Sequence, residues 1–200
     1  MINITFMFIT LTLTIANSQD IPDVKIYIES LCSDTLKSMK MISDQTIESL
    51  DQIAKVEFIP SGKKNPKGHH EPNTYITNCQ NNEKECYGNM ILACGLNLQK
   101  NQVESTKFVR CFFKEQSGEE FFDKEIDKCI GSVQQKLQVK ACANGPQGIE
   151  LLYRNRMKTP DLSFVPSIAI NGQIDKLKED FGKLICSKMN SSVCKGLKWD

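Results

Sequence analysis

Hydrophobic positions recur with two different periods near the start of the chain, which predicts a strand, a helix and a second strand in succession. Residues 24–29 combine β-branched and aromatic side chains with partial alternation, as expected of a strand. Ser33 and Asp34 are typical of a helix N-terminus. One helix with an apolar face is then expected from Leu36, Met39, Ile42, Ile47, Leu50 and Ile53. A second strand over residues 55–59 completes a βαβ unit, for which a right-handed crossover and a parallel pair are expected.

The middle of the chain predicts a helical block that is rich in cysteine, from residue 79 to about residue 153. Apolar residues share a helical face at three places, and the last of these faces carries Ile130, Val133 and Leu137. Residues 145–148, with the sequence GPQG, interrupt the helical pattern. A further helix is expected over residues 149–156.

A hairpin and a final helix are predicted for the C-terminal part. A strand within residues 164–174 turns at Asn171 and Gly172, a pair that strongly favours a two-residue hairpin turn. Pro166 stands at the start of that strand, where proline is tolerated. The amphipathic helix that follows is predicted from Leu177, Phe181, Leu184 and Ile185.

The order of these elements predicts a thioredoxin-like α/β fold with a disulfide-rich helical insertion. We expect residues 19–200 to form one domain, with the insertion at about residues 79–155. The composition agrees, because 200 residues with 40% hydrophobic and 24% charged side chains describe an ordinary globular chain. The net charge of +1 offers neither a basic surface for nucleic acid nor a strong attraction to an anionic membrane.

The first residues indicate a secretory destination. Residues 1–16 contain no charged side chain and form an apolar stretch that is short for a membrane span, which predicts a signal peptide cleaved after Ser18. An N-terminal membrane anchor is the alternative. No later segment is apolar over the length of a transmembrane helix. We therefore expect a secreted protein or one of the endosome–lysosome lumen, with Asn190 as a glycosylation acceptor.

Nine cysteines are distributed unevenly along the chain. Cys32 stands alone, and eight follow at Cys79, Cys86, Cys94, Cys111, Cys129, Cys142, Cys186 and Cys194. In an oxidising compartment we expect these eight to form structural disulfides, for which roughly 105 pairings exist. Cys186 with Cys194 is the first pair expected. Because nine is odd, one thiol stays free or pairs between chains, and Cys32 is the candidate for a free thiol or for a disulfide-linked homodimer.

Cys32 lies between the first strand and the following helix, a place that favours thiol chemistry. The N-terminus of a helix carries partial positive charge and favours a thiolate, the nucleophile of disulfide exchange. In a thioredoxin-like fold the bond between Val165 and Pro166 is expected to be cis and to lie against this thiol, where the backbone can align a substrate strand. The alternatives are an inert or disulfide-bonded Cys32 and an ordinary proline at the start of a strand.

Other candidate sites favour ordinary structural explanations. His69 and His70 with Cys79 and Cys86 have the residue types of a metal site, but their spacing and the oxidising compartment favour a solvated loop and disulfides. We expect no metal. A small basic loop at Lys63, Lys64 and Lys67 is expected to be solvated.

Five blocks of the sequence resemble the gamma-interferon-inducible lysosomal thiol reductase family. Residues 27–35, YIESLCSDT, resemble its active-site stretch. Residues 79–86, CQNNEKEC, followed by Gly88 and Asn89, are similar to its signature Cys-Gln-His-Gly-x-x-Glu-Cys. Residues 59–62, 142–152 and 165–172 match the family pattern in order. The resemblance implies reduction of protein disulfides by a Cys-x-x-Cys pair, in an acidic endosomal compartment or outside the cell.

The sequence departs from that pattern at Thr35, which occupies the position of the second cysteine. One hypothesis is an oxidoreductase in which Cys32 alone attacks protein disulfides and an external small thiol, such as glutathione or free cysteine, resolves the mixed disulfide. No other cofactor is expected, and a hydrogen bond from Thr35 to the Cys32 thiolate would assist. The alternative hypothesis is a catalytically inactive, secreted binding or regulatory protein.

Overall fold

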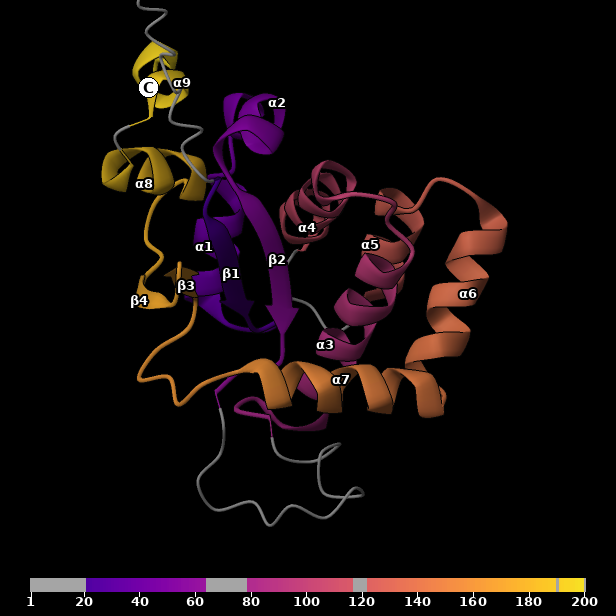
Figure 1. Ribbon diagram of the computed structural model, residues 1–200. Coiled ribbons are helices and arrows are strands. Elements are labelled where there is room, and N and C mark those ends of the chain that lie inside the picture. The colour runs from indigo at the N-terminus through magenta and orange to yellow at the C-terminus, as the bar shows by residue number, and fades with distance from the viewer. Residues whose placement is uncertain (1–20, 64–78, 117–121, 190, 200) are drawn as a thin grey trace, which may run out of the picture.

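A four-stranded mixed sheet forms the centre of the protein (Figure 1). The computed structural model describes residues 21–63, 79–116, 122–189 and 191–199. The strands are β1 (Asp23–Ile28), β2 (Lys55–Pro60), β3 (Ser167–Ile170) and β4 (Gln173–Lys176), in the order β2-β1-β3-β4. β1 runs parallel to β2 and antiparallel to β3, and β3 pairs with β4 as a hairpin. The predicted strands and the parallel pair are confirmed.

Helices supply most of the remaining structure. α1 (Ser33–Lys40) and α2 (Asp44–Ile53) connect β1 to β2. Five helices separate β2 from β3: α3 (Asn82–Asn97), α4 (Gln102–Glu115), α5 (Phe122–Cys129), α6 (Val133–Ala143) and α7 (Pro146–Lys158). In Figure 1, α3–α6 lie to the right of the sheet and α7 runs below them, and α8 (Phe181–Lys188) and α9 (Ser192–Gly196) close the chain. The mixed α/β class and the helical character of the middle region are confirmed, and the division into a domain with an insertion stays a prediction.

The two faces of the sheet bury side chains to different extents. Val24, Ile26 and Ile28 point from β1 into the main hydrophobic core, which includes residues of α1–α8. Tyr27 points the other way into a small second cluster with Ile59, Leu162, Val165 and Ala169. The loop before β3 therefore packs against the face of the sheet that carries Tyr27, and this packing places Val165 beside the end of β1.

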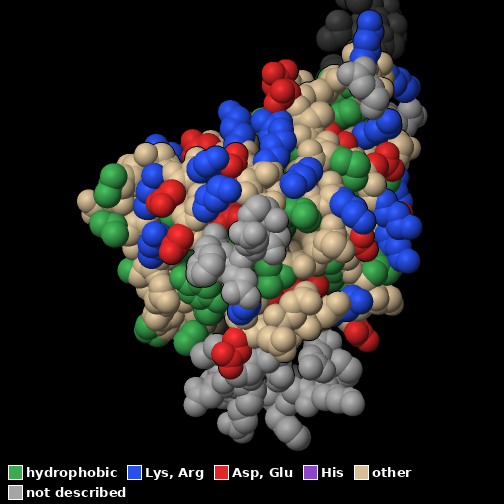
Figure 2. All heavy atoms as spheres, turned by 180° about the vertical axis from the view of Figure 1, so that it is seen from behind, with side chains coloured by type: hydrophobic (Ala, Val, Ile, Leu, Met, Phe, Trp, Pro, Cys, Tyr) green, Lys and Arg blue, Asp and Glu red, His purple; other side chains and the backbone are tan. Residues whose placement is uncertain are grey.

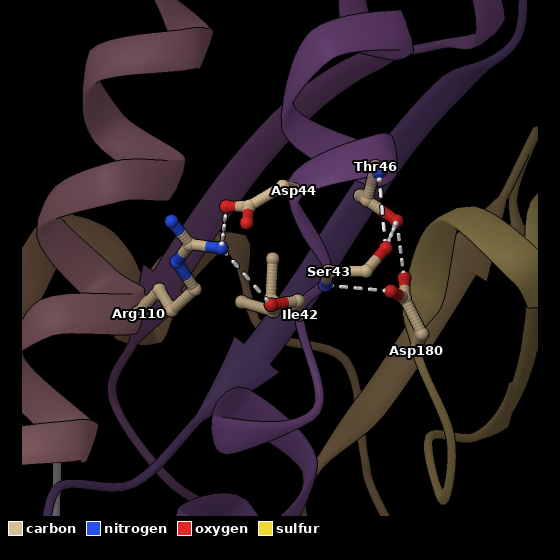
Figure 3. A network of polar contacts seen from close by, with 6 residues as sticks. All are labelled: Ile42, Ser43, Asp44, Thr46, Arg110 and Asp180. Carbon is tan, nitrogen blue, oxygen red and sulfur yellow. Dashed lines mark hydrogen bonds and ion pairs between the residues drawn. The ribbon is translucent and has the colours of Figure 1, made fainter. Parts of the chain in front are cut away.

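The single helix expected after Cys32 is wrong, because the chain breaks between α1 and α2. The hydroxyl of Ser43 accepts the N–H of Thr46 at 3.1 Å and caps α2. Asp180, which caps α8, accepts the N–H of Ser43 at 2.7 Å and the hydroxyl of Thr46 (Figure 3). Arg110 on α4 donates to the carbonyl of Ile42 at 3.3 Å. These tertiary partners replace the helical hydrogen bonds that a continuous helix would make.

Three further expectations about helices need correction. α7 begins at Pro146 and not at residue 149, because a proline in the first turn of a helix needs no hydrogen-bonded N–H. Val133 and Leu137 are 73% and 63% exposed, so they do not form the buried face that their spacing suggested. Leu177 is buried but precedes α8, and its N–H bonds to the carbonyl of Pro166 at 3.1 Å.

The hairpin turn agrees with the sequence. Asn171 and Gly172 have φ angles of 48° and 84°, the positive values that a type I′ turn requires at both central positions. The side chain of Asn171 also accepts the N–H of Asp23 at 3.0 Å, which fixes the turn to the start of β1.

Four disulfides connect the eight later cysteines. They join Cys79 to Cys86, Cys94 to Cys142, Cys111 to Cys129 and Cys186 to Cys194. The predicted pairing of Cys186 with Cys194 is confirmed, as is the free thiol of Cys32.

Surface charges are mixed, as the small net charge requires. The face seen in Figure 2 carries Lys and Arg side chains over much of its area, with Asp and Glu side chains between them. Across the described ranges, no helix is both long and apolar enough to cross a membrane. Within the same ranges no cluster of three or more His, Cys, Asp or Glu side chains could hold a metal ion. Several predicted features lie outside the described residues: the signal peptide, Lys64, Lys67, His69, His70 and Asn190.

Candidate active site around Cys32

Cys32 sits at the point where β1 ends and α1 begins. The helix starts at Ser33, so the N-cap residue is Cys32 itself and not Ser33 as its residue type suggested. The carbonyl of Cys32 accepts the N–H of Leu36 at 2.9 Å, the first hydrogen bond of the helix. The half-buried sulfur is thereby held at the positive end of α1, whose free N–H groups favour negative charge.

Val165 lies against this thiol, although 133 residues separate it from Cys32. The Sγ atom of Cys32 is 3.5 Å from the carbonyl oxygen of Val165. The bond between Val165 and Pro166 is cis, as expected. The structure therefore brings the two predicted parts of the site together at the edge of one pocket.

Thr35 occupies a different environment from the one expected. Its side chain is fully buried, and its hydroxyl oxygen accepts the backbone N–H of Glu29 at 3.4 Å. Among the described residues, no hydrogen bond joins Thr35 to Cys32. The threonine thus secures the end of β1 instead of contacting the sulfur.

A pocket of about 310 Å³ opens beside Cys32. Its lining includes Glu29, Cys32, Lys63, Gln80, Asn81 and Val165. These residues come from the segment after β1, the loop after β2, the segment before α3 and the loop before β3. The pocket is therefore a product of tertiary packing around the thiol.

Glu29 contributes a buried carboxyl group to this pocket. Its Oε1 atom accepts the N–H of Lys63 at 2.9 Å, whereas its Oε2 atom is buried without a hydrogen-bond partner. Burial first, and then the negative charge of Glu85, raise the pKa of Glu29 to about 7, against an opposing effect of Lys63. Gly62 approaches so closely that an added Cβ would collide with the Glu29 carboxyl, and its φ of +71° also favours glycine. This carboxyl group changes its charge near neutral pH.

The N-terminal half of α3 packs directly against the loop that carries Cys32. The side-chain oxygen of Asn89 accepts the N–H of Ser30 at 2.8 Å, and the hydroxyl of Ser30 donates to the carbonyl of Glu85 at 3.0 Å. Gly88 permits this approach, because a Cβ there would collide with the side chain of Ser30. The segment around Cys79 and Cys86 and the segment around Cys32 are therefore parts of one site.

The disulfide between Cys79 and Cys86 has a cationic neighbour. The Nη2 atom of Arg156, on α7, lies 3.0 Å from the Sγ atom of Cys79 and 3.6 Å from that of Cys86. Cys79 is half-buried and lies outside any helix, whereas Cys86 is fully buried within α3. A guanidinium group is thus positioned to interact with negative charge on either sulfur.

A second, wider groove of about 820 Å³ continues from the Cys32 pocket along Val165 and Pro166. Four lysines line it: Lys37, Lys40, Lys176 and Lys178. The ammonium group of Lys176 lies 4.5 Å from the centre of the Phe164 ring, a cation–π contact. Because Val165 borders both cavities, a chain lying in the groove would pass close to the thiol.

The sequence also matches a known family over the residues that build this site. Residues 23–133, more than half of the chain, match the family described as Gamma interferon inducible lysosomal thiol reductase (GILT). The chain belongs to the GILT family. A relative from Drosophila melanogaster, GILT-like protein 1, is 32% identical over 179 residues, covering 78% of this chain and 68% of the relative.

Two vertebrate GILT relatives carry the name Gamma-interferon-inducible lysosomal thiol reductase. The protein from Carassius auratus is 30% identical over 176 residues, or 82% of this chain and 67% of its own length. The protein from Mus musculus is 23% identical over 170 residues, again 82% of this chain, and 66% of its own length. The names of these relatives describe thiol reduction. The GILT match therefore supports the choice of the free thiol, Cys32, and its surroundings as the candidate active site.

Sequence reasoning missed several residues of this site. Glu29 lies within the stretch that resembles the family active site, and Asn89 follows the cysteine signature, so both stood near a detectable signal. No sequence pattern pointed to Arg156, because its contact with the disulfide depends on the packing of α7 against α3. The raised pKa of Glu29 could not be predicted from the sequence either, since it depends on burial and on Glu85.

Proposed function

We propose that the protein is a thiol–disulfide oxidoreductase with a thioredoxin-like fold, which acts on protein disulfides through Cys32. The observation that carries this proposal is the position of the thiol. Its sulfur lies at the N-terminus of α1, in contact with the Val165 carbonyl and open to a pocket. Membership of the GILT family supports the same reaction class.

The reaction begins with attack of the Cys32 thiolate on one sulfur of a substrate disulfide. A mixed disulfide forms, and the other substrate sulfur leaves as a thiolate that takes up a proton. An external small thiol, such as glutathione or cysteine, then attacks the Cys32 sulfur and releases the second substrate thiol. A second molecule of that thiol frees Cys32 and becomes the oxidised small disulfide. Two external thiols are thus consumed for each substrate disulfide reduced.

The lysine-lined groove bears on the choice of substrate. Lys37, Lys40, Lys176 and Lys178 place positive charge along a cavity that leads to Val165. We expect an extended substrate segment with acidic residues beside its disulfide to bind there, because complementary charge accelerates association. The four oxidised cysteine pairs favour a secreted protein or one of the endosome–lysosome lumen.

A second candidate function is a binding protein without turnover. Thr35 favours it, because this buried side chain bonds to the backbone of Glu29 and supplies no second thiol. In that case Cys32 would hold a partner covalently, or join two copies of the chain, and no product would be released.

A turnover assay separates the two functions. A peptide whose fluorescence is quenched while its disulfide is intact would be mixed with the protein and reduced glutathione at pH 5 and pH 7. We expect turnover that disappears in Cys32→Ser and is kept in Ser105→Ala, the control on α4, which lines neither the pocket nor the groove. A parent rate equal to that of Cys32→Ser would contradict the enzyme proposal. Accumulation of a stable mixed disulfide at Cys32, detected by mass mapping, would favour the binding protein.

A further inference from the structure

We propose that the disulfide between Cys79 and Cys86 is a second redox centre, and that its reduced form resolves the mixed disulfide at Cys32. This inference rests on the proposed function, because it requires that Cys32 attack a substrate. It assigns to Cys79 the resolving role for which residue 35 lacks a thiol.

The first argument is proximity. Ser30, two residues before Cys32, bonds to the carbonyl of Glu85 at 3.0 Å, and Glu85 directly precedes Cys86. On the other side of the disulfide, Gln80 and Asn81 follow Cys79 and line the same 310 Å³ pocket as Cys32. Cys79 is therefore next in the chain to residues that border the space in which a substrate sulfur bound to Cys32 would lie.

The second argument is the contact with Arg156. A disulfide sulfur is a weak hydrogen-bond acceptor, so a guanidinium group 3.0 Å away gains little from the oxidised pair. The same group stabilises a thiolate strongly, because the acceptor then carries a full negative charge. Arg156 thus favours the state that forms when the bond opens, and a better-stabilised leaving thiolate departs faster. Among the described residues, no cationic side chain donates a hydrogen bond to a sulfur of the other three disulfides.

The third argument is the unequal setting of the two sulfurs. Cys86 is fixed and fully buried within α3, whereas Cys79 is half-buried in the segment that precedes the helix. Once the bond is opened, Cys79 can move toward the pocket and Cys86 stays in place. A mobile attacking thiol and a fixed second thiol are the two parts that a resolving pair needs.

In each step of the proposed reaction, one sulfur–sulfur bond forms and one breaks. An external small thiol attacks Cys79, the Cys86 thiolate leaves beside Arg156, and a second external thiol frees Cys79 as the small disulfide is released. The Cys79 thiolate then attacks the Cys32 sulfur of the mixed disulfide, and the substrate thiolate leaves and is protonated. Finally the Cys86 thiolate attacks Cys79, which restores the Cys79–Cys86 bond and returns the electron pair to Cys32. Two external thiols are still consumed for each substrate disulfide.

The first test measures which disulfide opens first in the full chain with Cys32→Ser, so that its outcome does not depend on exchange at Cys32. Reduced glutathione would be added in steps, free thiols alkylated, and the peptides mapped by mass. We expect the Cys79–Cys86 bond to open before the other three, and Arg156→Met to slow its opening roughly tenfold while leaving the others unchanged. Another disulfide opening first, or an unchanged rate in Arg156→Met, would overturn the proposal.

The second test traps the resolving step with an aromatic disulfide that releases a coloured thiol. In Cys86→Ser, attack of Cys79 on the loaded Cys32 has no second thiol to reverse it. We expect two coloured thiols for each reagent molecule consumed and a stable cross-link between Cys32 and Cys79. The matched control is Cys111→Ser, which frees Cys129 and should show separate labels without a cross-link to Cys32.

The outcomes distinguish the two proposals. If Cys32 of the oxidised parent takes no label from the aromatic disulfide, the proposed function itself fails. If Cys32 is labelled but Cys86→Ser carries separate labels on Cys32 and Cys79, only the resolving role fails. Circular dichroism would show that each variant is folded, and the first test uses only chains in which all four disulfides are intact at the start.

Discussion

Two buried carboxyl groups at different ends of the sheet have opposite hydrogen-bonding environments. Asp180, before α8, accepts hydrogen bonds from the N–H of Ser43 and the hydroxyl of Thr46 (Figure 3). It accepts a third from the N–H of Gly182. Glu29, after the carboxyl end of β1, accepts one from Lys63 N–H, and its second oxygen is buried without a partner. In Figure 1, α8 lies near the top of the view and β2, which runs parallel to β1, points toward the bottom.

The difference separates a carboxylate that joins structural elements from a buried carboxyl group whose pKa is raised. A carboxylate that accepts several hydrogen bonds joins the elements that supply the donors, here α2 and α8. A buried carboxyl group with one donor and a negative neighbour binds a proton more easily, as the pKa of about 7 for Glu29 shows. The unsatisfied group lies in the pocket of the candidate nucleophile, and the satisfied group lies away from it. Of these two carboxyl groups, the one with the unsatisfied oxygen is therefore the one beside the candidate nucleophile.

The largest expected effect on stability comes from removing the satisfied carboxylate. Asp180→Ala leaves the N–H groups of Ser43 and Gly182 without their acceptor, and it should lower the free energy of unfolding by about 3 kcal/mol. Urea unfolding of the oxidised protein measures this. Asp175→Ala, which removes an exposed aspartate paired with Lys188, should have a much smaller effect. Equal effects of the two variants would mean that the Asp180 network does not stabilise the junction of α2 and α8.

The next largest effect is expected on turnover, from a substitution at Thr35, which bonds to the N–H of Glu29. Thr35→Cys supplies a thiol one helical turn after Cys32, and it should raise glutathione-dependent turnover roughly tenfold. This thiol resolves the mixed disulfide faster than an external thiol does, and it acts without prior opening of the Cys79–Cys86 bond. Thr35→Ser is the matched control, because it keeps a hydroxyl for the N–H of Glu29 and adds no thiol. A folded Thr35→Cys variant with no gain would show that the buried position 35 cannot present its side chain to the Cys32 sulfur.

The third prediction concerns the pH dependence of stability. The pKa of Glu29 is raised in the folded protein, so the folded state binds the proton more tightly than the unfolded chain. The stability that this proton contributes is complete below about pH 4.5 and is lost as the pH rises through about 7. Glu29→Gln removes the charge and keeps an acceptor for the N–H of Lys63. Its stability relative to the parent should therefore increase by about 2–3 kcal/mol from pH 5 to pH 8.

Urea unfolding at the two pH values gives this difference directly. Glu57→Gln is the control, because Glu57 forms an exposed ion pair with Lys158 and carries no comparable burial. A parallel pH response in the two variants would contradict the proton-binding role of Glu29.

The smallest effect on stability is expected from the exposed ion pair between Asp44 and Arg110, which lies near the Asp180 hydrogen bonds (Figure 3). Asp44 pairs with Arg110 at 2.6 Å, and the Arg110 side chain lowers the pKa of Asp44, first through its hydrogen bond and then through its charge. The carboxylate is 81% exposed, so water and salt screen the pair. Asp44→Asn should change the melting temperature by no more than about 2 °C. Because a lowered pKa stabilises only the ionised form, the difference should vanish as the pH falls below about 4.

Much of the fold followed from local patterns, and the errors share one cause. Periodicity located β1, β2 and the Asn171–Gly172 hairpin, because these depend on alternation and on turn residues that allow positive φ. The break between α1 and α2 was missed because Asp180 and Arg110, distant in the sequence, supply the bonds that end one helix and start the next. The spacing of Val133 and Leu137 matched a helix, but none of the described elements covers that face.

In the candidate site, too, the sequence predicted the features that depend on local patterns. Cys32 at a strand–helix junction, the threonine at position 35 and the proline before β3 could all be read from residue types and their order. The chain by itself also determined that one cysteine is left over, because nine is an odd number. Those properties depend on local backbone preferences and on counting.

Only the tertiary structure decided how those residues act together. The contact between Cys32 and Val165, the raised pKa of Glu29 and the approach of Arg156 to the Cys79–Cys86 disulfide all join segments far apart in the chain. Burial and electrostatic interaction depend on distances in space, which the linear order does not contain. The sequence therefore determined which reactive groups the protein has, and the packing of α3 and α7 around the end of β1 decided which of them meet.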